Sequence, residues 1–234
     1  MISAVLFDFG GTLDADGLHW LDRFYRIYDK LGLSHIDRPQ IKEAFYWADE
    51  QADKDPEMLK AEFRPMMERH ARWQFQKLGL QDAPLESKIA AEFYRPAEKV
   101  LHRNRKILET LSYAGLKLGI VSNFYGNIET LCKEFGYSPF INVIMDSKIT
   151  GLSKPDPAVF QAALDRLGVP ASDAAFVGDS FERDMIPAKS IGMRTYWLLG
   201  DQVRTPPDSS KVDVILRSLE DLPKDLICDP ENVA

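Results

Sequence analysis

Short apolar runs alternate with amphipathic helical patterns along the second half of the chain, and this order restricts the fold more than any other feature. The runs rich in β-prone residues are 117–122, 140–145, 174–178, 194–199 and 212–216. Apolar residues recur every three or four positions at 100–114, 127–135, 157–167, 184–191 and 218–222. Strands that alternate with helices pair in parallel, because each crossover needs a long connection. We therefore predict an α/β protein with a doubly wound, Rossmann-like parallel sheet.

One further apolar run, at 4–8, is separated from these strands by an all-helical block. Residues 18–94 repeat apolar side chains at helical intervals and show little β character. The first strand precedes this block while its expected sheet neighbours follow it, so the block is interpreted as an insertion. We predict a core of residues 1–14 and 97–234 and a helical cap of residues 15–96. Most of the many aromatic residues in the block are expected to pack inside it, with one or two facing a cleft.

The charge and the cysteine content exclude several classes of protein. The net charge of -7, from 36 acidic and 29 basic residues, repels phosphate backbones and argues against nucleic acid as a partner. No apolar run approaches the roughly 18 residues of a membrane span. Cys132 and Cys228 are far apart, which predicts neither a disulfide framework nor a cysteine zinc site. We expect a cytoplasmic protein, and the oligomeric state stays open.

Four loops carry polar residues suited to phosphate or metal chemistry. Asp8 ends the first apolar run and precedes Gly10 and Gly11, where bare backbone allows a ligand to approach closely. The other three loops carry Ser122 with Asn123, then Lys154, and then Asp179 with Asp184. In an open α/β sheet, ligands bind at the carboxyl ends of the strands. We expect all four loops to converge on one point.

These residue types form a set that handles phosphate. Mg²⁺ typically binds one or two carboxylates together with phosphate oxygens and water, so Asp8 and Asp179 are candidates to hold it. Lys154 is a candidate to neutralise charge on a transferring phosphoryl group. Ser122, Asn123 and the loop amides are candidate donors to the phosphoryl oxygens.

The same segments resemble the motifs of the haloacid dehalogenase-like hydrolases, in the branch with a helical cap inserted after the first motif. Residues 8–13 resemble the first motif, 121–123 the second, Lys154 with Pro155 the third, and 178–184 the fourth. The resemblance covers essentially the whole chain. Four motifs in order, with an insertion in the expected place, form a specific signal.

The resemblance implies a Mg²⁺-dependent phosphatase-like hydrolase that acts on a small phosphorylated molecule. Asp8 would attack phosphorus to give an aspartyl-phosphate, which water then hydrolyses. The carboxylates of Asp8 and Asp179 and the carbonyl of Gly10 would surround Mg²⁺. The other implied roles are Asp184 as a ligand or a carboxylate behind the ligands, Ser122 as donor, Lys154 as charge anchor, and Gly11 and Asn123 as phosphate-binding residues.

Position 10 departs from the family pattern, in which phosphatases usually carry a second Asp as general acid and base. Gly10 offers only hydrogen, and positioned acid–base groups contribute about 10²–10⁴-fold. Three explanations stay open. A nearby group such as Asp14, Asp16 or His19 substitutes; the substrate has a leaving group that needs no acid; or turnover is slow or absent and the protein binds a ligand or partner.

The fourth motif leaves two further alternatives. The metal-independent dehalogenases of the family have an altered fourth motif, whereas Asp179 and Asp184 form an acidic pair that favours a bound cation. Asp184 is also a candidate N-terminal cap for the helix that follows it. Signatures of P-loop enzymes, dinucleotide enzymes and GxSxG serine hydrolases do not occur in the sequence.

Overall fold

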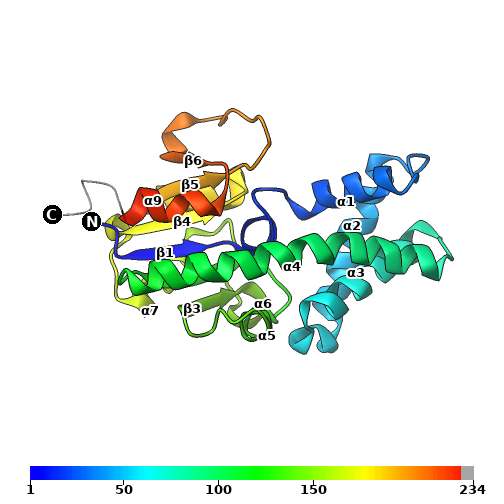
Figure 1. The fold of residues 1–234 in the computed structure, drawn as a ribbon, viewed down its shortest axis with the longest axis horizontal. Helices are drawn as coiled ribbons and strands as arrows, with labels where there is room; N and C mark the ends of the chain where they lie inside the picture. Colours follow the sequence, from blue (N-terminus) through cyan, green and yellow to red (C-terminus); the bar gives the residue numbers. More distant parts are fainter. Residues whose placement is uncertain (228–234) are drawn as a thin grey trace.

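The computed structural model describes residues 1–227 and contains a six-stranded parallel sheet (Figure 1). Its strands are β1 (Ala4–Phe7), β2 (Lys117–Ser122), β3 (Ile141–Asp146), β4 (Ala174–Gly178), β5 (Arg194–Leu198) and β6 (Val214–Leu216). They lie in the order β3-β2-β1-β4-β5-β6, and each neighbouring pair is parallel. The predicted doubly wound α/β fold is confirmed. Cys132 is buried and free, whereas Cys228 lies outside the described residues.

The helices fall into two groups along the chain. Between β1 and β2 come α1 (Trp20–Lys30), α2 (Arg38–Lys54), α3 (Phe63–Leu78) and α4 (Ala83–Tyr113). With the later strands come α5 (Ile128–Glu134), α6 (Ser147–Thr150), α7 (Pro157–Leu167), α8 (Ile186–Ser190) and α9 (Leu222–Ile227). Figure 1 shows α1, α2 and α3 standing beside the sheet, while α9 and the second half of α4 cover it.

The central strands are continuous apolar runs because both of their faces are covered. All residues of β1 and β4 are buried. Successive side chains of β1 point to opposite faces, so Val5 and Phe7 join one hydrophobic cluster while Ala4 and Leu6 join another. The first cluster contains residues of α4 and α9, and the second contains residues of α7 and α8. Burial on both faces is typical of parallel sheets.

Helix α4 joins the helical block to the sheet without a break. The sequence pattern predicts separate helices on either side of residues 95–99, and this prediction is wrong, because 31 residues form one helix that includes Pro96. Phe93, Ala97 and Leu101 are fully buried at four-residue intervals, while Pro96 is exposed. Packing of this continuous stripe therefore outweighs the hydrogen bond that the proline cannot make. The expected boundary at residues 96–97 falls inside the helix.

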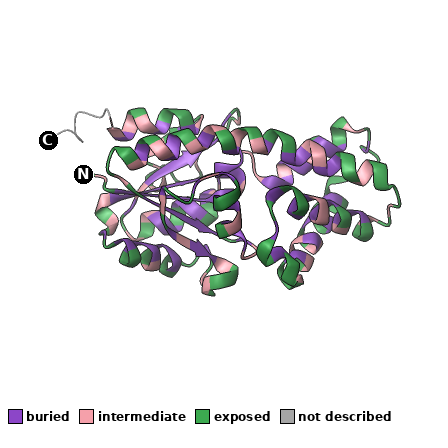
Figure 2. Ribbon diagram, turned by 60° about the horizontal axis from the view of Figure 1, so that its bottom comes forward, coloured by how far each residue is buried: buried purple, intermediate pink, exposed green. Residues whose placement is uncertain are grey.

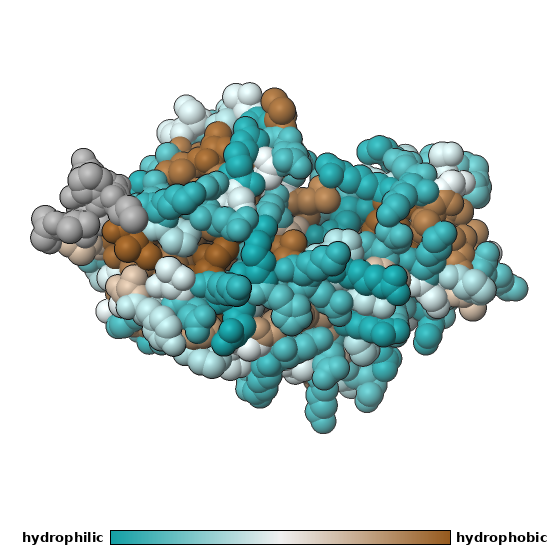
Figure 3. Space-filling model, in the orientation of Figure 1, coloured by the Kyte–Doolittle hydropathy of each residue, from teal (hydrophilic) through white to brown (hydrophobic). Residues whose placement is uncertain are grey.

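The surface and the interior are clearly separated. Buried residues lie on the strands and on the inward sides of the helices (Figure 2). The face drawn in Figure 3 is mostly hydrophilic. Among residues 1–227, the structure contains no helix with a stretch that is both long and apolar enough to cross a bilayer.

Candidate active site

The candidate site lies where the chain changes direction across the sheet. From β1 the chain continues to β2 and β3 on one side, while β4 pairs with the other side of β1. Asp8 follows β1, Asp179 follows β4, and Ser122 is the last residue of β2. Because the carboxyl ends of parallel strands share one edge of the sheet, these three residues meet there.

The turn after β1 brings the main chain close to Asp179. Gly11 has a φ of 89°, in the left-handed region that favours glycine. A Cβ added at Gly11 would lie 2.6 Å from Asp179 Oδ2. Any side chain at this position would therefore displace the carboxylate, and glycine is required on both grounds.

Lys154 is the cation at the centre of the site. Its Nζ lies 2.7 Å from Asp8 Oδ1 and 2.7 Å from Asp184 Oδ1, and the residue is only 5% exposed. Burial acts to lower the pKa of Lys154, but attraction to Asp184 and Asp8 outweighs it, so the pKa is raised. The lysine is thus held as an ammonium ion between two carboxylates.

Three carboxylates, from Asp8, Asp179 and Asp184, form one buried cluster. Each can offer an oxygen that lies within 4.8 Å of the others. Burial, and then the charges of Asp8 and Asp184, raise the pKa of Asp179 well above its usual value. Burial, opposed chiefly by Lys154, raises the pKa of Asp184 to about 6. One lysine does not neutralise three carboxylates, and oxygen donors of this kind are the ligands that Mg²⁺ prefers, so the donor set fits a divalent cation.

The alternative role of Asp184 as a helix cap is wrong. Asp184 Oδ2 accepts a 2.9 Å hydrogen bond from the main-chain N–H of Ser180, four residues before it. Helix α8 begins after Met185 and has no side-chain cap. The Asp184 carboxylate is therefore turned back toward the loop and Lys154.

The second motif supports the first and third. Ser122 Oγ donates a 2.8 Å hydrogen bond to Asp8 Oδ1. Asn123 Nδ2 donates to the carbonyl of Lys154 at 2.7 Å, and its Oδ1 accepts from the N–H of Lys154 at 2.8 Å. The Asn123 side chain is thus engaged in fixing the main chain of Lys154, whereas the sequence suggested a donor to phosphate.

One cavity unites the predicted residues with side chains from the helical block. The predicted residues that line it are Asp8, Gly10, Ser122, Asn123, Lys154, Asp179 and Asp184. The block contributes His19, Trp20, Phe45, Tyr46 and Asp49, and the remaining wall residues are Phe124, Tyr125, Ser180 and Arg183. Gly11 is the predicted residue that does not line the cavity, and it acts through its close approach to Asp179.

Comparison with known proteins identifies the family. A family model for haloacid dehalogenase-like hydrolases matches residues 2–192. The chain belongs to this family. Haloacid dehalogenase-like hydrolase domain-containing protein 3 of Danio rerio is 34% identical over 158 residues, which are 64% of this chain and 64% of that protein. The glyceraldehyde 3-phosphate phosphatase of Methanocaldococcus jannaschii is 33% identical over 119 residues, 50% of this chain and 52% of that protein. The matched region thus spans less than two thirds of the length of these relatives.

Solved structures share the fold over nearly the whole chain. A HAD phosphatase from Thermococcus onnurineus is 24% identical with a TM-score of 0.54, covering 97% of this chain and 98% of that one. A dehalogenase with an intermediate complex is 21% identical with a TM-score of 0.64, covering 95% of this chain and 96% of that one. Structures named as a phosphatase and as a dehalogenase therefore share this fold.

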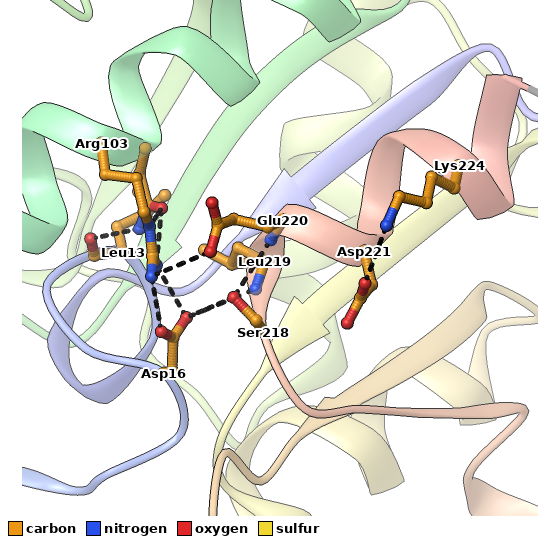
Figure 4. A network of polar contacts seen from close by, with 9 residues as sticks. Leu13, Asp16, Arg103, Ser218, Leu219, Glu220, Asp221 and Lys224 are labelled. Atoms are coloured by element: carbon orange, nitrogen blue, oxygen red, sulfur yellow. Dashed lines mark hydrogen bonds and ion pairs between the residues drawn. The ribbon is translucent and has the colours of Figure 1, made fainter.

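Two of the three candidates to replace the family's usual acid, Asp14 and Asp16, are committed to other contacts. Asp14 is fully buried and accepts hydrogen bonds from Gly11 N at 2.6 Å and Trp20 Nε1 at 2.8 Å. Asp16 accepts two 2.8 Å hydrogen bonds from the Arg103 guanidinium (Figure 4). Neither residue lines the cavity. Because of their positions, neither Asp14 nor Asp16 can serve as the acid–base group of this protein.

The third candidate, His19, does line the cavity. Its Nδ1 accepts a 3.2 Å hydrogen bond from Leu21 N and so caps α1. Burial lowers the pKa of His19, which favours the neutral imidazole. Because the lone pair on Nδ1 is used by the cap, the neutral ring carries its proton on Nε2.

Asp49 and Tyr125 are among the polar side chains of the cavity wall that sequence reasoning missed. Asp49 lies four residues after Phe45 on α2, so both fall on the same face of that helix. The spacing of the two could have been noticed, but only the packing of α2 determines which face meets the cavity. Tyr125 follows the second motif by two residues and carries no pattern of its own.

Proposed function

We propose that this protein is a phosphatase that hydrolyses a small phosphorylated molecule through an aspartyl-phosphate on Asp8. The observation that carries the proposal is the position of Asp8, whose carboxylate lies on a cavity wall between Ser122 Oγ and Lys154 Nζ. Relatives named as glyceraldehyde 3-phosphate phosphatases, and one named as a ribulose-1,5-bisphosphate 5-phosphatase, support a small phosphorylated substrate.

The described contacts suggest a role for each side chain. Ser122 and Lys154 both engage Asp8 Oδ1, which orients the carboxylate and leaves Oδ2 for attack on phosphorus. The Lys154 ammonium would also offset negative charge on the transferring group. Asn123 would act indirectly, by holding the main chain of Lys154.

Mg²⁺ is the cofactor that fits the acidic cluster. Asp8, Asp179 and Asp184 would hold it, together with the main-chain carbonyl of Gly10 that the family pattern implies. A bound divalent cation supplies charge neutralisation at the phosphoryl oxygens. Residues 15–96 would act as a cap that covers the cavity and selects the substrate, since cap side chains form part of its wall.

Release of inorganic phosphate from p-nitrophenyl phosphate, with Mg²⁺ and with a chelator, tests the proposal. We expect metal-dependent turnover that is lost in Asp8→Asn. Asp173→Asn is the matched control, because Asp173 directly precedes β4 and lies at the opposite edge of the sheet. Turnover that survives Asp8→Asn, or no phosphate release from any aryl or acyl phosphate, overturns the proposal. Halide release from a 2-haloacid without metal would indicate the dehalogenase reaction instead.

A further inference from the structure

One carboxylate of the cap reaches the cavity wall. Asp49, on α2, lines the cavity together with the three clustered carboxylates of the core, and its side chain is 32% exposed. The other carboxylates of that wall form the acidic cluster, in which Asp8 and Asp184 pair with Lys154. Among the described residues, Asp49 is thus the carboxylate that lines the cavity without belonging to the acidic cluster.

Two hydrogen-bond donors hold Asp49 at one oxygen. Tyr125 Oη donates to Asp49 Oδ1 at 2.5 Å, and His70 Nε2 lies 3.1 Å from the same oxygen. Tyr125 belongs to the core and His70 to α3 of the cap. The carboxylate is therefore fixed where cap and core meet, and within residues 1–227 no side chain or main-chain N–H donates to Oδ2.

The orientation of His70 is set by a buried chain of side chains inside the cap. Tyr28 Oη donates to Gln74 Oε1 at 3.2 Å, which leaves the Gln74 amide to donate to His70 Nδ1 at 2.9 Å. His70 Nε2 then carries a proton that is donated to Asp49. Tyr28, Gln74 and His70 are all fully buried. Each polar group in a buried network needs a hydrogen-bond partner. This network ends at Asp49 on the cavity wall.

Asp49 and Gly10 line the same cavity, and Trp20 lines it as well. The ring of Trp20 lies 6.5 Å from that of Tyr125 and 6.4 Å from that of His70, the two donors to Asp49. The Nε1 atom of the same indole lies 3.2 Å from the place of a Cβ at Gly10. Trp20 thus occupies the space beside Gly10, and Asp49 is the cap carboxylate that lines the same cavity.

We propose that Asp49 is the general acid and base of the reaction, supplied by the cap in place of the side chain that Gly10 lacks. His70 and Tyr125 are positioning residues that orient it. The inference rests on the proposed phosphatase reaction. His19, another titratable cap residue on the wall, is less suited, because its neutral ring has used its only lone pair to cap α1.

The proposed proton transfers balance over one turnover. In the first step a carboxylate oxygen of Asp8 bonds to phosphorus, the bond from phosphorus to the leaving oxygen breaks, and that oxygen takes the proton from Asp49 Oδ2. In the second step the oxygen of a water molecule bonds to phosphorus and one of its protons passes to Asp49. The bond from phosphorus to Asp8 then breaks, which restores both carboxyl groups and releases inorganic phosphate.

The test compares two substrates of similar shape whose leaving groups differ in basicity, p-nitrophenyl phosphate and phenyl phosphate. Asn at position 49 keeps an oxygen for Tyr125 and His70 but carries no transferable proton. In Asp49→Asn we expect phenol release in the first turnover to slow about 10²-fold or more, because the basic leaving group needs a proton. The burst of p-nitrophenolate released in the first turnover should slow far less. Aspartyl-phosphate should accumulate, because its hydrolysis lacks a general base.

Asp53→Asn is the matched control. Asp53 lies four residues after Asp49 on α2 and pairs with Lys148 of the core at 3.0 Å, but it does not line the cavity. Its replacement should change neither the burst nor the leaving-group dependence. Tyr125→Phe removes one donor to Asp49 and should give a smaller loss that is again selective for phenyl phosphate.

The outcomes separate this inference from the phosphatase proposal. Equal slowing of both substrates in Asp49→Asn, or no slowing at all, overturns the role of Asp49 while leaving the role of Asp8 intact. If His19→Asn slows phenyl phosphate selectively while Asp49→Asn slows neither substrate, the acid–base role belongs to His19. That outcome also overturns the role of Asp49. Failure of Asp8→Asn to abolish turnover instead overturns the phosphatase reaction itself.

Discussion

Trp20 Nε1 donates a 2.8 Å hydrogen bond to Asp14 Oδ2, and this bond fixes the indole against Gly10. The indole is also packed edge-on against Phe93 and Phe124, with ring centroids 5.2 Å and 5.6 Å away. A Cβ at Gly10 would lie 3.2 Å from Nε1 and 3.3 Å from Cε2. The absence of an acid at position 10 is thus accompanied by an aromatic side chain that fills its space.

Gly10→Ala should therefore destabilise the protein through overpacking, although its φ of -75° suits any residue. Inserting a methyl group into a well-packed region typically costs about 1–3 kcal/mol. We expect the free energy of unfolding to fall by that amount in urea titrations, with a lower melting temperature. Unchanged stability would show that Trp20 moves freely.

A double-mutant cycle assigns this loss to its cause. Trp20→Phe provides a smaller ring near Gly10 and removes the N–H donor to Asp14. If the indole is the obstacle, Gly10→Ala should destabilise the Trp20→Phe background less than the wild type, because residues in contact couple by about 0.5–3 kcal/mol. Strict additivity of the two changes in unfolding free energy would place the clash elsewhere.

Gly11→Ala should be more damaging than Gly10→Ala. The φ of 89° strains any L side chain, and a Cβ would lie 2.6 Å from Asp179 Oδ2. We expect a loss of more than about 1 kcal/mol of stability, together with loss of phosphate release. Gly32→Ala is the control for strain alone, because Gly32 has a φ of 77° and nothing within 4 Å of the added Cβ. Equal effects of the two substitutions would contradict the close approach to Asp179.

The fold was predictable because period and order are local properties of the chain. The pattern at 174–178 predicts the strand that the structure shows as Ala174–Gly178, since a run of apolar residues between turn signals needs no distant information. The break expected before residue 100 fails because the stripe of Phe93, Ala97 and Leu101 is stabilised by tertiary packing. Helix propensity does not include this packing, and it counts a proline inside a helix as strongly unfavourable.

The candidate site was predictable only in its core half. Residues such as Asp8 and Asp179 stand at strand ends, and strand ends of a parallel sheet converge by topology. Asp49 had no such marker, because its donors His70 and Tyr125 come from distant segments that only the packed cap brings together. Asp14 was a candidate by proximity in sequence, and its burial beneath Trp20 removes it.

Mg²⁺ should stabilise the protein against heat through the acidic cluster. A ligand that binds only the folded state at 100 times its dissociation constant adds about 2.7 kcal/mol. We expect the melting temperature to rise with Mg²⁺ concentration in the wild type and in Asp173→Asn, and to rise far less in Asp179→Asn. A response to Mg²⁺ that persists in Asp179→Asn would mean that the cation binds elsewhere.

His19 should make stability depend on pH. Burial lowers the pKa of His19 below the ordinary value of 6.5. Below pH 6.5, His19 is therefore protonated more readily in the unfolded chain than in the folded protein. Its contribution to stability is therefore present above pH 6.5 and is lost as the pH falls toward the lowered pKa. His19→Asn keeps a cap for α1 but removes the titration, so its unfolding free energy should decline less than that of the wild type between about pH 7.5 and 5.5. Urea titrations across this range measure the difference. His35→Asn is the control, because His35 lies in an exposed loop. Parallel pH profiles for the wild type and His19→Asn would refute a buried neutral imidazole at position 19.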